Sequence, residues 1–337
     1  MYISFDIPLL IVAILGLAAL AAFVAVSYIG VLSKRVAQAR QFCDSAEAYP
    51  QDDADYLPAS IIVYSQDEAD ALDTLLRSII AQDYPAPIEI IVVNEGESTD
   101  VRDTVMLLQN AFPNLYLTHT PDGAHSLSRK KLAITLGVKA ARHEVVVLTA
   151  IGAEIRSNLW LRDMMRHFRS GGPVELVIGY AAQMPDNDDG NGARCRAFDT
   201  TARSVRWLGA ALDGHPFRAT EFNVAYTRSA FFRNKGFSRS LNLHFGDDDI
   251  FISEIAREDN TAVELGTNSI VGLLAHHYGH TMHRIALRHI FTEGRIKHRP
   301  RIWATLSEIA SPLALLLPVA AVVMCPLNAV VVVPAVI

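Results

Sequence analysis

The fold class is decided by the stretch Ser60-Ile-Ile-Val-Tyr64, by the helical periodicity from Asp67 to Ala81, and by the run Ile88-Glu-Ile-Ile-Val-Val93. Both short runs are rich in β-branched residues, which is typical of strands that are buried on both faces of a sheet. A strand, a helix and a second strand in this order form a βαβ unit with parallel strands. The sequence therefore predicts an α/β domain that begins near residue 59.

The same alternation continues along the chain. Arg102 to Phe112 and Arg129 to Ala141 have helical patterns, and Leu115–Thr118 and Val145–Leu148 are short apolar runs. Strands that alternate with helices predict a mostly parallel central sheet with helices on both faces. Ligands of such sheets bind at the carboxyl ends of the strands, so we expect functional residues directly after these runs.

The two ends of the chain are apolar enough to enter a membrane. Ile7 to Leu32 and Pro312 to Ile337 contain no charged residue, and each is long enough to cross a bilayer. Lys34, Arg35 and Arg40 follow the first stretch. An excess of cations on that side predicts that the following domain faces the cytoplasm.

These patterns predict five segments. Residues 1–33 form a transmembrane anchor, residues 34–58 a juxtamembrane linker, and residues 59–280 the folded domain. Residues 281–305 form a basic membrane-interface segment, and residues 306–337 a transmembrane or re-entrant region. The predicted location is the inner (plasma) membrane, with the folded domain in the cytoplasm.

The charge and the cysteine content exclude some classes of function. The formal net charge is -6 and no basic patch is interleaved with aromatic residues, so we expect no nucleic-acid partner. Cys43, Cys195 and Cys325 are odd in number and scattered, which fits neither a disulfide framework nor a zinc site. We therefore expect the protein to bind a small or lipid-linked partner at a membrane.

Polar residues follow the predicted strands in a family-specific pattern. Tyr64-Ser-Gln-Asp-Glu68 follows the first strand, and Asn94-Glu95-Gly96 follows the second. Together with Lys130–Ala141, Phe217–Phe237 and Gly246–Phe251, these segments resemble family 2 glycosyltransferases over about residues 59–295. The resemblance implies an A-type glycosyltransferase fold. It also implies a nucleotide-sugar site that includes Ser65, Asp67, Glu68, Asn94 and Glu95.

Three adjacent aspartates, Asp247, Asp248 and Asp249, are the predicted catalytic group. Sugar transfer with inversion needs a base that removes the proton of the acceptor hydroxyl, and a carboxylate can serve as this base. By its place in the family pattern Asp248 is the predicted base. Asp247 and Asp249 are predicted to orient it or the acceptor. Taken alone, the run would also fit an acidic helix N-terminus.

The segment after the run Val145–Leu148 departs from the family. Family members have two aspartates there, spaced as Asp-x-Asp, which bind Mg²⁺ or Mn²⁺ beside the diphosphate. In this chain the two positions are Ala150 and Gly152, and Glu154 is a weak substitute because its spacing differs. Four histidines lie at positions 276, 277, 280 and 283, and three of them, His276, His280 and His283, would share one face of a helix and could form a replacement site, although the family pattern favours a loop there.

Three cations could lie near the phosphates of a donor. Lys131 and Arg288 are predicted to contact the nucleotide-sugar, and Lys130 could add further positive charge. Arg288 and His289 belong to a family element near the carboxyl end, whose leading polar residue is absent here. A solvated basic face beside anionic lipid would explain Arg288 equally well.

The resemblance implies a transferase that moves a hexose from a nucleotide-sugar, expected to be UDP-linked, to a lipid-linked or surface-glycan acceptor at the cytoplasmic membrane face. The missing Asp-x-Asp leaves two alternatives open. One is a catalytically impaired pseudo-glycosyltransferase that serves as a binding or scaffold partner. The other is a metal-independent transferase in which Lys130, Lys131 or Arg288 supplies the positive charge.

Overall fold

The chain divides into two compact units, which are described separately below. One unit comprises residues 1–34 and 300–337, and the other comprises residues 35–299. The computed structural model describes residues 7–50, 52–121, 127–184, 191–247, 249–273, 287–288, 290–296, 309–310, 313–314 and 316–319.

The first unit contains most of the long helix α1 (Ile7–Cys43), which has 37 residues. The mean hydropathy of this helix reaches 2.5 over an 18-residue window. By length and composition it could cross a membrane, and it is the one helix among the described residues with this property. Ala21 and Ala25 of α1 pack with Ala310 in the same unit.

The second unit begins with residues 35–43 of α1 and two short 3-10 turns, η1 (Ala46–Ala48) and η2 (Asp53–Asp55). The hydroxyl of Tyr49 donates to Asp163 at 2.7 Å, and the amide of Thr267 donates to Asp44 at 2.6 Å. Residues 35–58 therefore pack onto the folded domain through specific polar contacts, which composition alone did not indicate.

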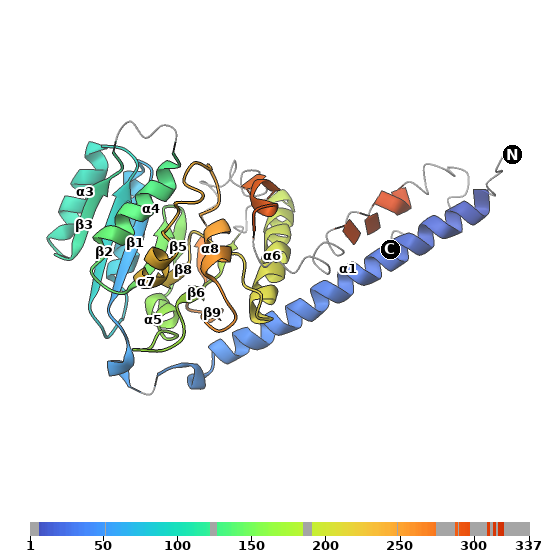
Figure 1. Ribbon diagram of the computed structural model, residues 1–337, viewed down its shortest axis with the longest axis horizontal. Coiled ribbons are helices and arrows are strands. Elements are labelled where there is room, and N and C mark those ends of the chain that lie inside the picture. Colours follow the sequence, from blue (N-terminus) through green and yellow to red (C-terminus); the bar gives the residue numbers. More distant parts are fainter. Residues whose placement is uncertain are drawn as a thin grey trace. The chain divides into compact units, whose positions relative to one another are not determined.

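A central sheet of seven strands has the order β3-β2-β1-β4-β8-β6-β9 (Figure 1). Strands β1 to β4 pair with one another in parallel, whereas β8 runs antiparallel to both β4 and β6. The predicted mostly parallel α/β sheet is thus confirmed. The strands are β1 (Ala59–Ser65), β2 (Ile88–Asn94), β3 (Leu115–His119), β4 (Val145–Ala150), β6 (Leu176–Ile178), β8 (Val224–Thr227) and β9 (Thr261–Val263).

Strand β1 explains why the sequence has uninterrupted apolar runs. It lies between β2 and β4, and every residue in it is buried. Ile61 pairs with Ile90 on one side and with Val147 on the other. Because helices cover both faces, successive side chains point into apolar surroundings on either side of the sheet.

The helices α2 (Ala69–Ile80), α3 (Thr99–Gln109) and α4 (Arg129–Ala140) follow β1, β2 and β3. On α2 the buried residues recur at helical spacing, as Leu72, Leu75, Leu76 and Ile79. This amphipathic stripe is what predicts the helix from sequence.

Helix α4 lies close against the sheet. A Cβ atom at Gly137 would come within 2.7 Å of Ile62 Cγ2 on β1, so only glycine fits at this contact. The close approach fixes the position of the first turn of α4, which carries Arg129, Lys130 and Lys131.

The remaining elements complete the second unit. A smaller sheet has the order β5 (Ala153–Ile155), β10 (Val271–Leu273) and β7 (Ala181–Gln183). The other helices are α5 (Trp160–Met165), α6 (Asn191–Leu212), α7 (Arg228–Arg233) and α8 (Ile250–Ile255).

Candidate functional site

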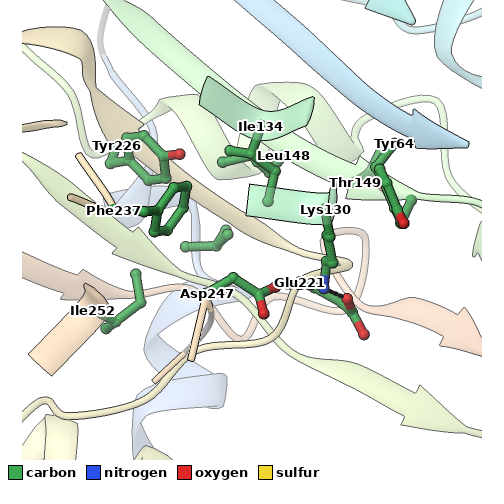
Figure 2. A pocket seen from close by; sticks show the side chains of 12 residues that line it. Tyr64, Lys130, Ile134, Leu148, Thr149, Glu221, Tyr226, Phe237, Asp247 and Ile252 are labelled. Atoms are coloured by element: carbon green, nitrogen blue, oxygen red, sulfur yellow. Dashed lines mark ion pairs between the residues drawn. The ribbon is translucent and has the colours of Figure 1, made fainter. Parts of the chain in front are cut away.

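A pocket lies at the carboxyl ends of β1 and β4, where ligands of parallel sheets are expected. It encloses about 380 Å³ of empty volume, part of which is open solvent. Tyr64 of β1, Thr149 of β4 and Lys130 of α4 line the pocket (Figure 2). Ala150 of β4 also belongs to the lining. Apolar side chains, among them Phe237 of the loop after α7, form the opposite wall.

Three charged side chains, Lys130, Glu221 and Asp247, line this pocket, and a fourth, Arg288, contacts the two carboxylates. The ammonium of Lys130 contacts the carboxylates of Glu221 and Asp247 (Figure 2). The guanidinium of Arg288 contacts the same two carboxylates, with Nη1 at 2.7 Å from Glu221 Oε1 and Nη2 at 3.2 Å from Asp247 Oδ1. We call these four residues the charge square, because each cation touches both anions.

The charge square joins segments that are far apart in sequence. Lys130 lies in the first turn of α4, whose N-terminus is capped by the hydroxyl of Ser128. Glu221 lies in the loop between α6 and β8, and Asp247 in the loop before α8. Arg288 lies in a short helical stretch near residue 290. The side chains of all four are at most 17% exposed, so their charges interact in a medium less polar than water.

Gly246 sets the backbone in front of Asp247. Its φ is +106°, a conformation that residues with a Cβ rarely adopt. A Cβ atom here would also lie 2.6 Å from Ile250 Cδ1. Glycine at this position therefore lets the chain turn tightly between the loop and helix α8, which carries Asp247 into the pocket.

Burial and two cations act in opposite directions on Asp247. Desolvation raises the pKa of this buried carboxyl, but the charges of Lys130 and Arg288 outweigh that effect and hold the pKa well below its usual range. Asp247 is therefore an ionised anchor at neutral pH. A carboxylate stabilised in this way has little tendency to take up a proton, so it is a poor general base in this arrangement.

Asp249 is also occupied by contacts. One carboxylate oxygen accepts from the amide of Ile250 at 2.6 Å at the start of α8, and the other accepts from the hydroxyl of Thr292. Arg218 Nη2 lies 3.7 Å from the same carboxylate. Asp248, the predicted base, lies outside the described residues.

Lys131, adjacent to Lys130, points elsewhere. Its side chain is fully buried, and Nζ donates to the carbonyls of Ser240, Leu243 and Phe245 at 2.6, 3.2 and 2.7 Å. These carbonyls belong to the loop that leads to Gly246. Lys131 thus supports that loop, and of the two neighbouring lysines it is Lys130 that lines the pocket.

A second group of predicted residues gathers at the ends of β1 and β2. Asn94 is buried; its side-chain amide donates to Asp67 at 2.6 Å, and its oxygen accepts from the Asp67 amide at 3.0 Å. Ser65 is buried at the end of β1, and Glu68 precedes the first turn of α2. Hydrogen bonds between Asn94 and Asp67 therefore join the turn after β1 to the end of β2.

Tyr64 connects this group to the pocket. Its hydroxyl donates to the carboxylate of Glu95, and its ring lies 5.9 Å from Lys130 Nζ. Burial, together with the hydrogen bond to Glu95, raises the pKa of Tyr64, so the phenol stays neutral. Tyr64 thus lies between Glu95, at the end of β2, and Lys130 of the charge square.

The residues at the expected metal site do not fit a divalent cation. Ala150 lines the pocket where an aspartate would be required, and it offers no ligand. Glu154 lies in β5 and its carboxylate binds Arg156 Nη2 at 2.6 Å. Among the residues that the structure describes, no three His, Cys, Asp or Glu side chains gather in a way that could hold a metal ion. The four histidines between 276 and 283 lie outside them.

Sequence reasoning missed Glu221. It lies in a loop without regular periodicity, so no local signal marks it as a partner of Lys130 and Arg288. Two hydroxyls of the lining were also missed: those of Thr149 and Tyr226 are buried and have no hydrogen-bond partner among the described residues. Buried polar groups are normally paired, so these two are available to a ligand or to water.

The fold is similar to that of a solved mannosyltransferase. A mannosyltransferase from Pyrobaculum calidifontis, solved in complex with GDP-Man and Mn²⁺, has a TM-score of 0.63 at 18% identity, with 95% of this chain and 92% of that chain covered. Glucosyl-3-phosphoglycerate synthase from Mycobacterium tuberculosis has a TM-score of 0.43 at 12% identity, with 71% and 80% covered.

No protein-family model and no curated protein matches the sequence. At 18% sequence identity, the similarity to the mannosyltransferase establishes the fold alone. The chain therefore has an α/β fold similar to that of the mannosyltransferase.

Proposed function

We propose that this protein is a glycosyltransferase that moves a hexose from a nucleotide-sugar to an acceptor hydroxyl. The observation that carries the proposal is the pocket at the carboxyl ends of β1 and β4, which places Asp247 beside two cations on a fold shared with a mannosyltransferase solved with GDP-Man. A UDP-linked hexose is the first donor to test, and GDP-Man is the second.

In the proposed step the acceptor oxygen attacks the anomeric carbon of the sugar. A new carbon–oxygen bond forms as the bond from that carbon to the diphosphate breaks, so the configuration inverts. The nucleoside diphosphate leaves with the electron pair, and the proton of the acceptor hydroxyl passes to a carboxylate. The enzyme must therefore place a base on one side of the sugar and positive charge beside the diphosphate on the other.

Asp248 is the proposed base. Its two neighbours are held by strong contacts, Asp247 in the charge square and Asp249 at the start of α8. Neither neighbour is therefore well placed to accept a proton, and both instead fix the backbone on either side of Asp248. We assign Asp247 and Asp249 as positioning residues.

The turns after β1 and β2 are proposed to hold the nucleoside. Ser65 and Asn94 end the two strands, Asp67, Glu68 and Glu95 follow them, and the hydrogen bonds between Asn94 and Asp67 fix the shape of this edge. Carboxylates and amides at such an edge can accept from a base or a ribose hydroxyl.

The acceptor is proposed to be a lipid-linked or growing surface glycan at the cytoplasmic face of the inner membrane. The support is helix α1, which is long and apolar enough to span a bilayer, and the cations that follow its apolar part. A transferase anchored in this way would meet lipid-linked substrates in two dimensions.

Release of nucleoside diphosphate from UDP-hexoses and GDP-Man, with membrane lipid as acceptor, tests the proposal. We expect turnover by the full-length protein in detergent and a loss of roughly 10²–10⁴-fold in Asp248→Asn. Asp259→Asn, at an exposed carboxylate that pairs only locally with Arg257, is the matched control and should keep the wild-type rate. Absence of turnover with every donor would favour the pseudo-glycosyltransferase alternative.

A further inference from the structure

We infer that Lys130 and Arg288 form the binding site for the diphosphate of the donor in place of a divalent metal, and that Glu221 occupies this site until the donor displaces it. The inference rests on the proposed function and adds to it the groups that bind the diphosphate and an internal competitor for them.

The geometry of the charge square suits an anion with several oxygens. Lys130 and Arg288 each contact both Glu221 and Asp247, so four carboxylate oxygens already surround the two cations. A diphosphate offers oxygens of the same kind at comparable spacing, and a guanidinium can bind two of them at once. The carboxylates thus show where phosphate oxygens could bind.

The surroundings favour an anion over a cation. The lining at the end of β4 is Thr149 and Ala150, and neither side chain carries a negative charge. Acidic residues at this place would repel a diphosphate unless a metal ion lay between them. Here Ala150 and Gly152 stand at the two acid positions of the family and two cations are present, and both differences favour direct binding of the diphosphate to the protein.

The two carboxylates of the charge square differ in how firmly they are held. Asp247 is more deeply buried, with 4% of its side chain exposed against 13% for Glu221, and a backbone hydrogen bond further stabilises its ionised form. Glu221 lies in the loop between α6 and β8 and is the one residue of that loop in the charge square. Glu221 is therefore the carboxylate that the donor displaces, and Asp247 continues to hold both cations in place.

The displacement explains how the pocket stays folded without its ligand. Two cations buried beside a single carboxylate would carry an uncompensated charge, which is costly in a poorly hydrated site. Glu221 neutralises that charge in the free protein. When the donor dissociates as nucleoside diphosphate, the carboxylate returns, and this competition speeds the release of product.

Calorimetric titration of UDP and GDP into the full-length protein in detergent, in the presence of EDTA, tests the inference. We expect binding without added metal, at least tenfold weaker binding in Lys130→Met, and several-fold tighter binding in Glu221→Gln. Lys139→Met is the matched control, since Lys139 is an exposed lysine on the same helix, and it should bind like wild type.

A single substitution in a buried ion network can unfold the protein, so the double variant Lys130→Met/Glu221→Gln is also measured. It keeps the local charge balanced between Arg288 and Asp247, and its melting curve reports whether the fold is intact. We expect it to bind at least tenfold more weakly than Glu221→Gln alone, and a folded double variant that binds diphosphate as tightly as Glu221→Gln would overturn the inference.

Two further outcomes are distinct. Binding that requires Mn²⁺ and vanishes with EDTA would overturn the inference, since a metal ion would then be needed to hold the diphosphate, while the proposed transferase function would stand. Failure to bind any nucleotide, with or without Mn²⁺, would overturn the proposed function and the inference with it.

Discussion

Lys130 and Lys131 are adjacent in sequence but lie in different surroundings. Lys130 reaches two carboxylates in the pocket, whereas the Lys131 ammonium is bound to three backbone carbonyls. Successive residues on a helix point about 100° apart, so a change of one position turns a side chain from the pocket to the protein interior. A sequence alone shows two cations, and only the three-dimensional structure separates their roles.

Replacing Lys131 should destabilise the protein. In Lys131→Met the carbonyls of Ser240, Leu243 and Phe245 lose a buried charged donor, with an expected cost of about 2–4 kcal/mol. Thermal unfolding of the full-length protein would show this as a melting temperature lower by roughly 5 °C or more. Lys139→Met should melt like wild type. An unchanged melting temperature in Lys131→Met would contradict the supporting role of this lysine.

Ionisation of Asp247 is expected to make the stability of the fold depend on pH in the acidic range. Lys130 and Arg288 hold its pKa in the folded protein well below the value of about 3.9 in an unfolded chain, despite burial. The ionised group thus stabilises the fold above that value, and the stabilisation is lost as the pH falls through the folded-state pKa. We expect the melting temperature of wild type to drop more steeply between pH 5 and about pH 3 than that of Asp247→Asn. If the melting temperatures of the two proteins fall in parallel as the pH is lowered, the ionised carboxylate of Asp247 does not stabilise the fold.

At the scale of elements, the position of Lys130 depends on how closely α4 approaches β1. Gly137 makes this approach possible, since any Cβ there would come within 2.7 Å of Ile62 Cγ2. The contact lies two turns along the helix from Lys130. A shift of α4 away from the sheet would therefore move the ammonium relative to Glu221 and Asp247.

Gly137→Ala should weaken diphosphate binding without touching the pocket. Alanine favours a helix by about 1 kcal/mol over glycine, but overpacking against Ile62 costs roughly 1–3 kcal/mol. We expect a small loss of thermal stability together with several-fold weaker UDP or GDP binding by calorimetry. The double variant Gly137→Ala/Ile62→Ala removes Ile62 Cγ2 from the contact and should recover part of the affinity. Wild-type affinity in Gly137→Ala would show that the pocket is independent of this packing.

The elements also show what the sequence could predict. The runs at Ile61 and Ile90 lie in strands buried on both faces, and the stripe at Leu72 follows one face of α2, so their periodicity revealed them. Glu221 and Tyr49 make equally specific contacts but lie in irregular segments. Their partners are set by the tertiary fold, which no local pattern encodes.

The predicted site shows the same division. The turns at Asp67 and Asn94 follow strands, and parallel strands bring their carboxyl ends to one edge, so sequence order predicted their proximity. The resemblance to a family marked Asp247 and Arg288 as site residues, and Lys130 was expected only to lie near the phosphates of a donor. That these three side chains meet, with Glu221 as the second anion, required the structure.

At the scale of the whole molecule, the proposed orientation has a natural reporter. Cys195 on α6 is exposed, whereas Cys43 is buried, so a membrane-impermeant maleimide should react with Cys195 once it can reach the folded domain. In intact cells we expect no labelling at Cys195, and in opened membranes we expect full labelling. Cys195→Ser identifies the signal. Labelling of Cys195 in intact cells would place the domain on the outer side and contradict the proposed location.

The most direct test of the account is a structure of the full-length protein with a UDP-hexose or GDP-Man bound in the presence of EDTA. The account predicts diphosphate oxygens within hydrogen-bonding distance of Lys130 Nζ and the Arg288 guanidinium, Glu221 displaced, and the sugar beside the segment 246–249. A diphosphate bound away from both cations, or Glu221 still in contact with them while the donor occupies the pocket, would contradict it.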